Sequence, residues 1–349
     1  MKNDYYSFLF GSPQLKIFIV LQLCLLSFVS LSILTPVPKT AFSDGLFEEK
    51  LPPASLGNRQ LSLFTKINPP LLTPETVNQT KYLQLELSEA DLNKTIPHVY
   101  YYVSVSKDGD LLIRELFHSH QGSLTINVNS FNEQDVKVFG DREPMMGAWT
   151  AYNLNDTFQA DNITIQAPIL NEGGLYDLQV DIFGIDNDTN RFKAINSLTF
   201  DSGLSVGEIN TYDINQLGTR SNVTVITYYD SIQNFSFSSQ NGSISWDMPF
   251  DWDTDRFKGD QSIVVHQEIK VPKRLAANST DALVGKVNGE VQVGRSFVVD
   301  PFSSQDAFTI HYIMGNDDLV KMANSSDTVK PIGDNGRQLM RFELGGIKG

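Results

Sequence analysis

The sequence predicts an all-β protein with two consecutive β-sandwich domains after an N-terminal hydrophobic helix. Short segments with a period of two recur along the chain, and turn residues interrupt them at intervals near ten. One apolar run stands near the N-terminus. About 300 residues follow it, and a domain usually takes roughly 100 to 200 residues, so two cores are expected.

The apolar run, Ile17–Leu34, has no charged residue and follows a short N-terminus, residues 1–16, that carries Lys2 and Lys16. As a helix it would rise roughly 27 Å, which is close to the thickness of a bilayer core. It predicts a single-pass membrane anchor with the N-terminus inside and the rest of the chain on the outer face of the cytoplasmic membrane. Ala41-Phe42-Ser43 fits a signal-peptidase site, so secretion after cleavage at Ser43 is the alternative.

Composition excludes several classes of function. The chain has 27 Lys+Arg against 41 Asp+Glu and shows no basic cluster, so nucleic acid is not an expected partner. Its single cysteine, Cys24, lies inside the apolar run. The exported part therefore has no disulfide, no thiol nucleophile and no thiolate for a blue-copper site.

Asn-x-Ser/Thr sequons are abundant, and all of them follow the apolar run, which predicts an exported surface that carries N-linked glycans. The alternative is a β surface that is simply rich in Asn, Ser and Thr. The acceptor residues are Asn78, Asn93, Asn155, Asn162, Asn187, Asn222, Asn234, Asn241, Asn278 and Asn324.

The proline-rich residues 35–75 are predicted as a spacer that ends in a first edge strand, Gln60 to Ile67. Sandwich 1 is predicted over residues 76–205 and sandwich 2 over residues 206–349, with a polar boundary at Ser205 to Arg220. The strands expected in sandwich 1 are Lys81–Leu87, Val99–Val105, Leu111–Phe117, Leu124–Val128, Val136–Phe139, Ile163–Ala167 and Tyr176–Phe183. Those expected in sandwich 2 include Asn222–Tyr229, Ser243–Trp246, Ser262–Val271, Phe308–Ile313 and Leu339–Leu344.

The segment from Glu172 to Leu178 predicts that the sandwiches are immunoglobulin-like. An acid, glycines and Tyr176 before a strand are typical of a tyrosine corner, in which the hydroxyl bonds to nearby backbone and the residue two positions on enters the core. That residue is Leu178, where antibody domains have a cysteine. The alternative is an ordinary glycine-rich turn.

Several runs in the second half carry a resemblance: Ser231 to Phe237, Ile244 to Trp246, Ile269 to Lys273 and Val287 to Gly289. They resemble a β-sandwich module of archaeal secreted and surface-anchored proteins. Over roughly residues 50 to 345, the chain is similar to exported proteins of ammonia-oxidising (thaumarchaeal) archaea that carry no assigned function. The resemblance implies an extracytoplasmic β fold and brings no catalytic residues.

Three histidines form the sharpest chemical candidate. His118 and His120 are two residues apart, so on a strand they project from one face. A three-residue turn with Gly109 at a bulge would pair residue 98 with 118, which places His98 on that face. The same register puts these residues on the opposite, buried face, with Glu115 as the one misfit: Val99, Tyr101, Val103, Val105, Leu111, Ile113 and Phe117. A two-residue Asp108-Gly109 turn would instead direct His98 away. Three imidazoles would suit Cu²⁺ or Zn²⁺, and solvated strand histidines are the alternative.

Acidic and aromatic residues give two weaker candidates. Asp251, Asp253 and Asp255 alternate and offer the oxygen ligands that Ca²⁺ prefers, but the EF-hand spacing fails, and a solvated loop is the alternative. Trp246, Phe250, Trp252 and Phe257 predict core packing, with sugar stacking as the alternative.

Gly203-Leu204-Ser205-Val206-Gly207 matches the nucleophile-elbow motif of serine hydrolases, but no helix is expected after it, so hydrolase activity is a remote alternative. The sequence therefore predicts a non-enzymatic surface protein that acts in binding or in cell-envelope structure. Its expected partners are the membrane, through residues 17–34, and other envelope proteins. A copper- or zinc-binding ectodomain is the alternative.

Overall fold

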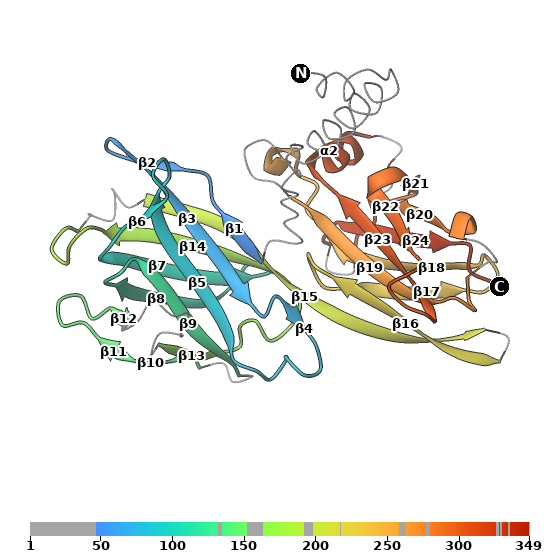
Figure 1. Ribbon diagram of the computed structural model, residues 1–349, viewed down its shortest axis with the longest axis horizontal. Coiled ribbons are helices and arrows are strands. Elements are labelled where there is room, and N and C mark those ends of the chain that lie inside the picture. The colour runs from blue at the N-terminus through green and yellow to red at the C-terminus, as the bar shows by residue number, and fades with distance from the viewer. Residues whose placement is uncertain are drawn as a thin grey trace, which may run out of the picture. The chain divides into compact units, whose positions relative to one another are not determined.

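The computed structural model describes residues 47–131, 135–151, 163–191, 198–216, 218–257, 263–276, 280–325, 328, 330–333 and 336–348. Over these ranges the chain is nearly all β, as predicted, with three sheets and an α-helix, α2 (Asn316–Asn324) (Figure 1). Neither Ile17–Leu34 nor Cys24 lies within the described residues.

Two facing sheets enclose the first core, which we call sandwich 1. One sheet has the order β1-β3-β5-β9-β13-β10, with β2 beside β3 and β6 beside β5. The other consists of β11-β12-β8-β7-β14 and the first part of β15. The first sheet comprises β1 (Glu48–Lys50), β2 (Ala54–Leu56), β3 (Arg59–Asn68), β5 (Lys81–Glu89), β6 (Lys94–Thr95), β9 (Ser123–Ser130), β10 (Lys137–Phe139) and β13 (Thr164–Ala167). The second comprises β7 (Val99–Lys107), β8 (Asp110–Ser119), β11 (Asp141–Arg142), β12 (Trp149–Ala151), β14 (Gly174–Gly184) and β15 (Leu198–Gln216).

Alternation along these strands explains the layers. On β5 the residues Leu83, Leu85 and Leu87 are buried, and on β7 Val99, Tyr101 and Val103 are buried, while the residues between them are mostly less so. All six belong to one apolar cluster, because a period of two directs alternate side chains to one face.

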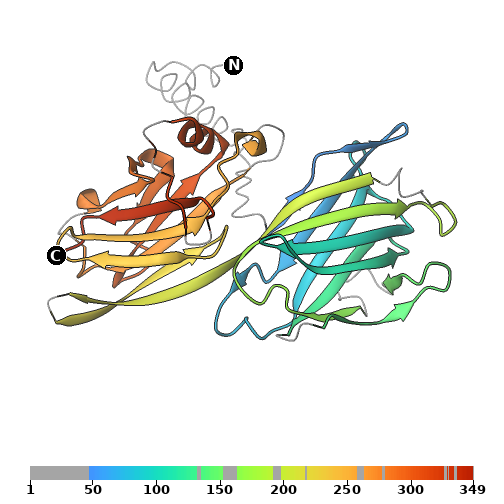
Figure 2. The same ribbon diagram turned by 180° about the vertical axis from the view of Figure 1, so that it is seen from behind.

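A second core, sandwich 2, forms in the same way (Figure 2). The sheet begun by β11 to β15 continues through β16-β19-β23-β22, with β4 beside β15, and faces a five-stranded sheet of order β17-β18-β24-β20-β21. The strands of the continuing sheet are β4 (Leu71–Leu72), β16 (Thr219–Thr227), β19 (Val265–Pro272), β22 (Phe297–Asp300) and β23 (Ala307–Met314). The facing sheet has β17 (Gln233–Ser238), β18 (Ser243–Pro249), β20 (Val284–Val287), β21 (Glu290–Val291) and β24 (Leu339–Gly345), and short 3₁₀ turns η2 (Thr254–Phe257), η3 (Thr280–Ala282) and η4 (Gly294–Ser296) connect strands.

The aromatic group near Trp246 packs in this second core, as predicted. Trp246, Phe250, Trp252 and Phe257 are all buried, and Trp246 stacks on Phe342 with ring centroids 5.4 Å apart. The helix α2, which the β pattern of the sequence did not predict, adds Leu319 and Met322 to the same apolar cluster.

The predicted polar boundary is itself strand. Ser205 to Arg220 was expected to separate the domains, but β15 pairs with β14 through its first half and with β16 through its second. The buried cluster of sandwich 1 ends at Val206 and that of sandwich 2 begins at Ile214, so the cores change over within this strand. A polar strand is possible there because ladder hydrogen bonds do not depend on side chains.

The predicted spacer is also wrong over its described part. Gln60 to Ile67 was expected at a sheet edge, but β3 lies between β1 and β5, and Leu61, Leu63 and Ile67 are fully buried. Flanking prolines suggested an edge, yet none lies within β3, so its backbone donors are free to pair on both sides.

The hydrogen bond and the core residue expected of a tyrosine corner are both present. The Tyr176 hydroxyl donates to the Glu172 carbonyl oxygen at 3.0 Å, and Leu178 is buried in the core of sandwich 1. Burial of the ring raises the pKa of Tyr176 well above its usual value, so the hydroxyl keeps its proton and remains a donor.

Replacement of Tyr176 by Phe should lower the free energy of unfolding by about 1 to 3 kcal/mol, because the Glu172 carbonyl loses its buried donor. Urea unfolding of Tyr176→Phe and of Tyr82→Phe, a half-buried tyrosine on β5, provides the comparison. Equal stability of the two variants would contradict a structural role for the corner.

Candidate metal centre

The hairpin between β7 and β8 determines where the histidines point. Asp108 and Gly109 both have positive φ angles, 53° and 88°, and Lys107 pairs with Asp110, so the turn has two residues. The predicted three-residue turn is therefore wrong. A bulge follows at once, since Val105 pairs with Ile113 but Ser106 pairs with Leu111.

This bulge returns His98 to the expected face. The predicted partner of His98 was His118, but the His98 backbone N–H donates to the His120 carbonyl oxygen at 3.0 Å, and His118 lies opposite Tyr100. The register differs from the expected one by two residues, and a shift of two leaves every side chain on its original face. Leu111, predicted to be buried, is 51% exposed because the bulge lies beside it, and Leu112 packs against the core instead.

The three histidines converge with Asp188, and we call these four residues the His98 cluster. One ligand atom from each lies within 4.8 Å of the others. Asp188 Oδ1 lies 2.8 Å from His98 Nδ1, 3.1 Å from His118 Nε2 and 3.9 Å from His120 Nδ1, and the His98 and His120 Nδ1 atoms are 3.3 Å apart. The three histidines were predicted to form a group, but Asp188 was not predicted to join them.

A structured loop after β14 brings Asp188 to the histidines. The Asp186 N–H donates to the Pro97 carbonyl, next to His98. The Nε and Nη2 atoms of Arg191 donate to the Asp188 backbone carbonyl at 3.1 and 3.0 Å. Asn187 Oδ1 accepts from the Thr189 N–H at 3.0 Å. The backbone is thus held by hydrogen bonds while the Asp188 carboxylate faces the imidazoles.

His118 is the buried member of the cluster. Its side chain is 1% exposed, and Tyr100 stacks on it with ring centroids 4.3 Å apart. Although His118 Nε2 lies 3.1 Å from Asp188 Oδ1, neither ring nitrogen makes a hydrogen bond with suitable geometry within the described part of the chain. Burial, together with the nearby His120, lowers the pKa of His118 to about 4, so the ring is neutral at pH 7 and its nitrogens can act as metal ligands.

The other three members face solvent, with side-chain exposures of 33% to 40%. Partial burial would raise the pKa of Asp188, but the His98 hydrogen bond and the neighbouring imidazoles outweigh it, so this pKa is lowered and the carboxylate is ionised. The cluster therefore offers imidazole nitrogens and an anionic oxygen beside a solvent opening.

A second group of ligand-bearing residues lies on sandwich 2, and we call it the His266 cluster: His266, Glu268 and His311. This cluster was not among the sites predicted from the sequence. His266 and Glu268 are two residues apart, so their placement on one strand face could have been predicted from the sequence. His311 joins them only through the pairing of β19 with β23, which no local pattern predicts. The two clusters together contain all five histidines of the chain.

The predicted calcium ligands do not form such a group. Asp251 Oδ1 accepts from the Asp253 N–H at 3.0 Å, and neither residue belongs to a metal-ligand group among the described residues. The side chain of Asp255 lies outside the described ones. Nearby Asp247 forms a two-bond ion pair with Arg341, at 2.7 and 2.8 Å. Asp251 and Asp253 therefore do not converge as ligands for a cation.

The nucleophile-elbow hypothesis is wrong. Ser205 lies in the middle of β15, is 2% exposed, and its hydroxyl donates to the Tyr229 carbonyl at 2.9 Å. An elbow needs a sharp strand-to-helix turn that exposes the serine hydroxyl. Here the strand continues to Gln216, so the hydroxyl has no access to a substrate.

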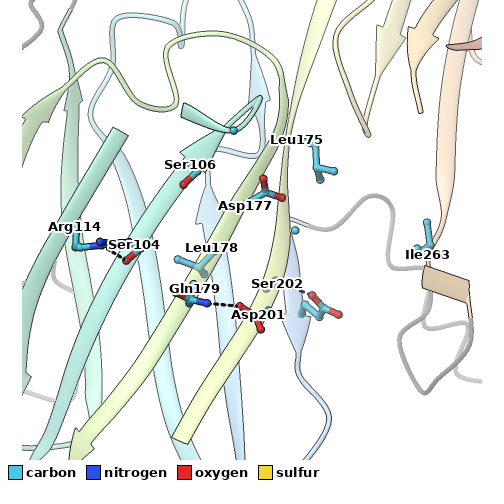
Figure 3. A pocket seen from close by; sticks show the side chains of 13 residues that line it. Ser104, Ser106, Arg114, Leu175, Asp177, Leu178, Gln179, Asp201, Ser202 and Ile263 are labelled. Atoms are coloured by element: carbon cyan, nitrogen blue, oxygen red, sulfur yellow. Dashed lines mark hydrogen bonds between the residues drawn. The ribbon is translucent and has the colours of Figure 1, made fainter. Parts of the chain in front are cut away.

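A polar hollow lies on the same outward face of sandwich 1 as the His98 cluster, toward the other end of β7 (Figure 3). Its polar groups pair with one another: Arg114 with Ser104 at 3.2 Å and Gln179 with Asp201 at 3.0 Å. Ser202 donates to Glu49 at 2.9 Å, and burial raises the pKa of that carboxyl. These pairs stabilise the sheet surface and leave the His98 cluster as the stronger candidate site.

Seven of the ten sequon asparagines fall within the described ranges, and each of the seven is exposed, as a glycan acceptor must be: Asn78, Asn93, Asn187, Asn222, Asn234, Asn241 and Asn324. Asn155, Asn162 and Asn278 lie outside those ranges. Glycosylation itself stays a prediction.

No helix among the described residues is long and apolar enough to cross a membrane. Comparison with protein-family models, curated proteins and solved structures finds no match to the chain.

The metal-free protein should lose about 2 to 3 kcal/mol of unfolding free energy through His118 between pH 6.5 and 4.5. Below its usual value of 6.5 the ring protonates in the unfolded chain, but in the folded chain it does so only near pH 4. The unfolded state binds more protons in this window, so the free energy of unfolding decreases by up to about 1.4 kcal/mol for each unit by which the pH is lowered. Urea unfolding at both pH values should show a smaller loss for His118→Gln than for the wild type, and equal losses would contradict the assignment.

Proposed function

We propose that this chain is an extracytoplasmic surface protein that binds one divalent transition metal ion, Cu²⁺ or Zn²⁺, at the His98 cluster. The observation that supports the proposal is the convergence of four ligand atoms within 4.8 Å around a buried imidazole whose nitrogens lack hydrogen-bond partners among the described residues. An unsatisfied buried polar group costs about 1 to 3 kcal/mol, and coordination to a metal would offset that cost.

The distances favour a metal over a hydrogen-bonded network. With bonds of about 2.0 Å, the ligands of a tetrahedral ion lie roughly 3.3 Å apart. The His98 and His120 Nδ1 atoms are separated by 3.3 Å, and three contacts to Asp188 Oδ1 span 2.8 to 3.9 Å. One oxygen facing three imidazoles is a poor hydrogen-bond arrangement, because they compete for its lone pairs.

The ligand types select the metal and the kind of role. Imidazole nitrogen suits Cu²⁺ and Zn²⁺, and Cu²⁺ binds more tightly in the general order of affinities. Four protein ligands fill a tetrahedral shell, whereas catalytic zinc sites keep a position for water. The proposal is therefore metal holding or delivery without turnover.

The cellular setting is part of the same proposal. The apolar run Ile17–Leu34 and the exposed sequons support an anchored or secreted ectodomain, and the resemblance to thaumarchaeal surface proteins agrees with it. The hydroxyl contact of Tyr176 to Glu172 supports an immunoglobulin-like relationship for sandwich 1.

Substitution of Asp188 by Asn should weaken the tightest Cu²⁺ equivalent by more than about tenfold, because the anionic ligand is lost. The control is Asp186→Asn in the same loop, whose carboxylate pairs with Arg59 at 2.7 Å rather than with a histidine. Calorimetric titration of both variants measures the difference, and a His118→Gln/His120→Gln double variant should lose that equivalent. Wild-type affinity in Asp188→Asn and in the double variant would refute the site.

The native protein should fractionate with membranes or culture medium and carry glycans at exposed sequons such as Asn78, Asn222 and Asn241. Peptide mass spectrometry of protein from its source organism reads both the glycans and the first residue of the mature chain. Recovery from the cytosol with unmodified asparagines would rule out the extracytoplasmic setting, while leaving metal binding to be judged by titration.

A further inference from the structure

We infer that the His266 cluster is a second site for a divalent transition metal ion, with a coordination position left open to solvent or a small ligand. It lies on sandwich 2 and shares no residue with the His98 cluster. The inference therefore does not depend on the first site.

The three candidate ligand atoms lie at separations from one another that are close to those of ligands around one metal ion. His266 Nε2 is 3.3 Å from His311 Nδ1 and 3.8 Å from Glu268 Oε1, and His311 Nδ1 is 3.5 Å from the same oxygen. These separations are close to the roughly 3.3 Å expected between ligands of one tetrahedral ion. Small rotations of the side chains would bring all three atoms to one cation.

Strand geometry explains why the three side chains meet. Val265 and Ile269 on β19 enter the core of sandwich 2, so His266 and Glu268, which alternate with them, project from the opposite face. Glu268 lies directly across from His311 on β23. The cluster thus rests on two paired strands, which hold ligands more rigidly than a loop does.

Charge and burial also favour a cation. The side chains of His266, Glu268 and His311 are only 7%, 15% and 24% exposed, low values for the outward face of a sheet. Within the described ranges, the ion-pair partners of Glu268 are the two histidines, and no Lys or Arg pairs with it. The Tyr228 hydroxyl donates to Glu268 Oε1 at 3.4 Å, a long hydrogen bond that brings no positive charge. A poorly solvated carboxylate needs compensation, and a metal ion on the two imidazoles would supply it.

The two clusters repeat one arrangement. In the His98 cluster Tyr100 stacks on the most buried histidine from the neighbouring strand, and in the His266 cluster Tyr228 stacks on His266 with ring centroids 4.7 Å apart. The Tyr228 N–H donates to the His266 carbonyl at 3.2 Å, which continues the β16–β19 ladder. A flat aromatic cover restricts ring rotation and keeps the buried nitrogen directed at its partners.

The sites differ in how many ligands the protein supplies. Two imidazoles and one carboxylate leave at least one position of a tetrahedral ion unfilled, as in zinc sites that retain a water. The His266 cluster should therefore bind more weakly than the His98 cluster and exchange its fourth ligand freely.

The test is a Zn²⁺ titration of the full-length ¹⁵N-labelled wild-type protein, followed through its five imidazole signals. The first equivalent should shift the signals of His98, His118 and His120, and the second those of His266 and His311, with single His→Gln variants used for assignment. If the His266 and His311 signals do not move at two equivalents, the second site is overturned. If only those two move, the second site stands and the function proposed for the His98 cluster fails.

Calorimetry supplies an independent readout. Glu268→Gln should weaken the second Zn²⁺ equivalent by more than about tenfold and leave the first unchanged. Glu343→Gln on β24, whose carboxylate forms a surface pair with Lys286 at 3.4 Å, is the matched control and should bind two equivalents as the wild type does. A wild-type stoichiometry of one, or an unaltered second equivalent in Glu268→Gln, overturns the inference.

Discussion

The cross-strand pairing of Tyr100 with His118 is the constraint on which the proposed metal site depends. It fixes a buried imidazole beneath an aromatic ring on the outward face of sandwich 1. His98 and His120 lie just beyond the ends of β7 and β8, where the His98 N–H donates to the His120 carbonyl and holds both residues beside His118. The bulge beside Leu111 is what permits this register with a two-residue turn. Without it, each β8 side chain would lie on the opposite face, and the imidazoles would enter the apolar core.

The two faces of each strand have different roles throughout the molecule: inward side chains stabilise the fold, and outward side chains carry the groups that could bind a ligand. Inward residues such as Val103 and Val265 pack in the two cores, where apolar burial provides the main driving force for folding. Outward residues on the shared eleven-stranded sheet supply His118 and the whole His266 cluster, while His98, His120 and Asp188 lie just beyond its strands. Substitutions there change ligands without opening a cavity in the core, so a sandwich can gain a metal site at little cost to its fold.

Local patterns predicted most of the strands, because alternation and turn residues are short-range signals. The face of the histidines agrees with the prediction only because the bulge between Val105 and Ser106 compensates for the wrongly predicted turn. Long-range pairing was not predictable from local patterns. Asp188 joins the cluster only because β14 lies beside β7, and the Ser205 motif is excluded only because β15 extends unbroken to Gln216. The central position of β3 likewise could not be predicted, because it depends on pairing with both β1 and β5.

The distribution of histidine supports the proposal that both clusters prefer borderline metals. With a net charge of −14, the surface attracts cations of every kind, but exposed carboxylates favour hard ions such as Ca²⁺ and Mg²⁺. Nitrogen ligands are confined to two places, and each pairs at least two imidazoles with one carboxylate. The acidic surface would raise the local concentration of cations in general, and the imidazoles would then retain Cu²⁺ or Zn²⁺ from that pool. Five histidines scattered singly over the same surface would give the first effect without the second.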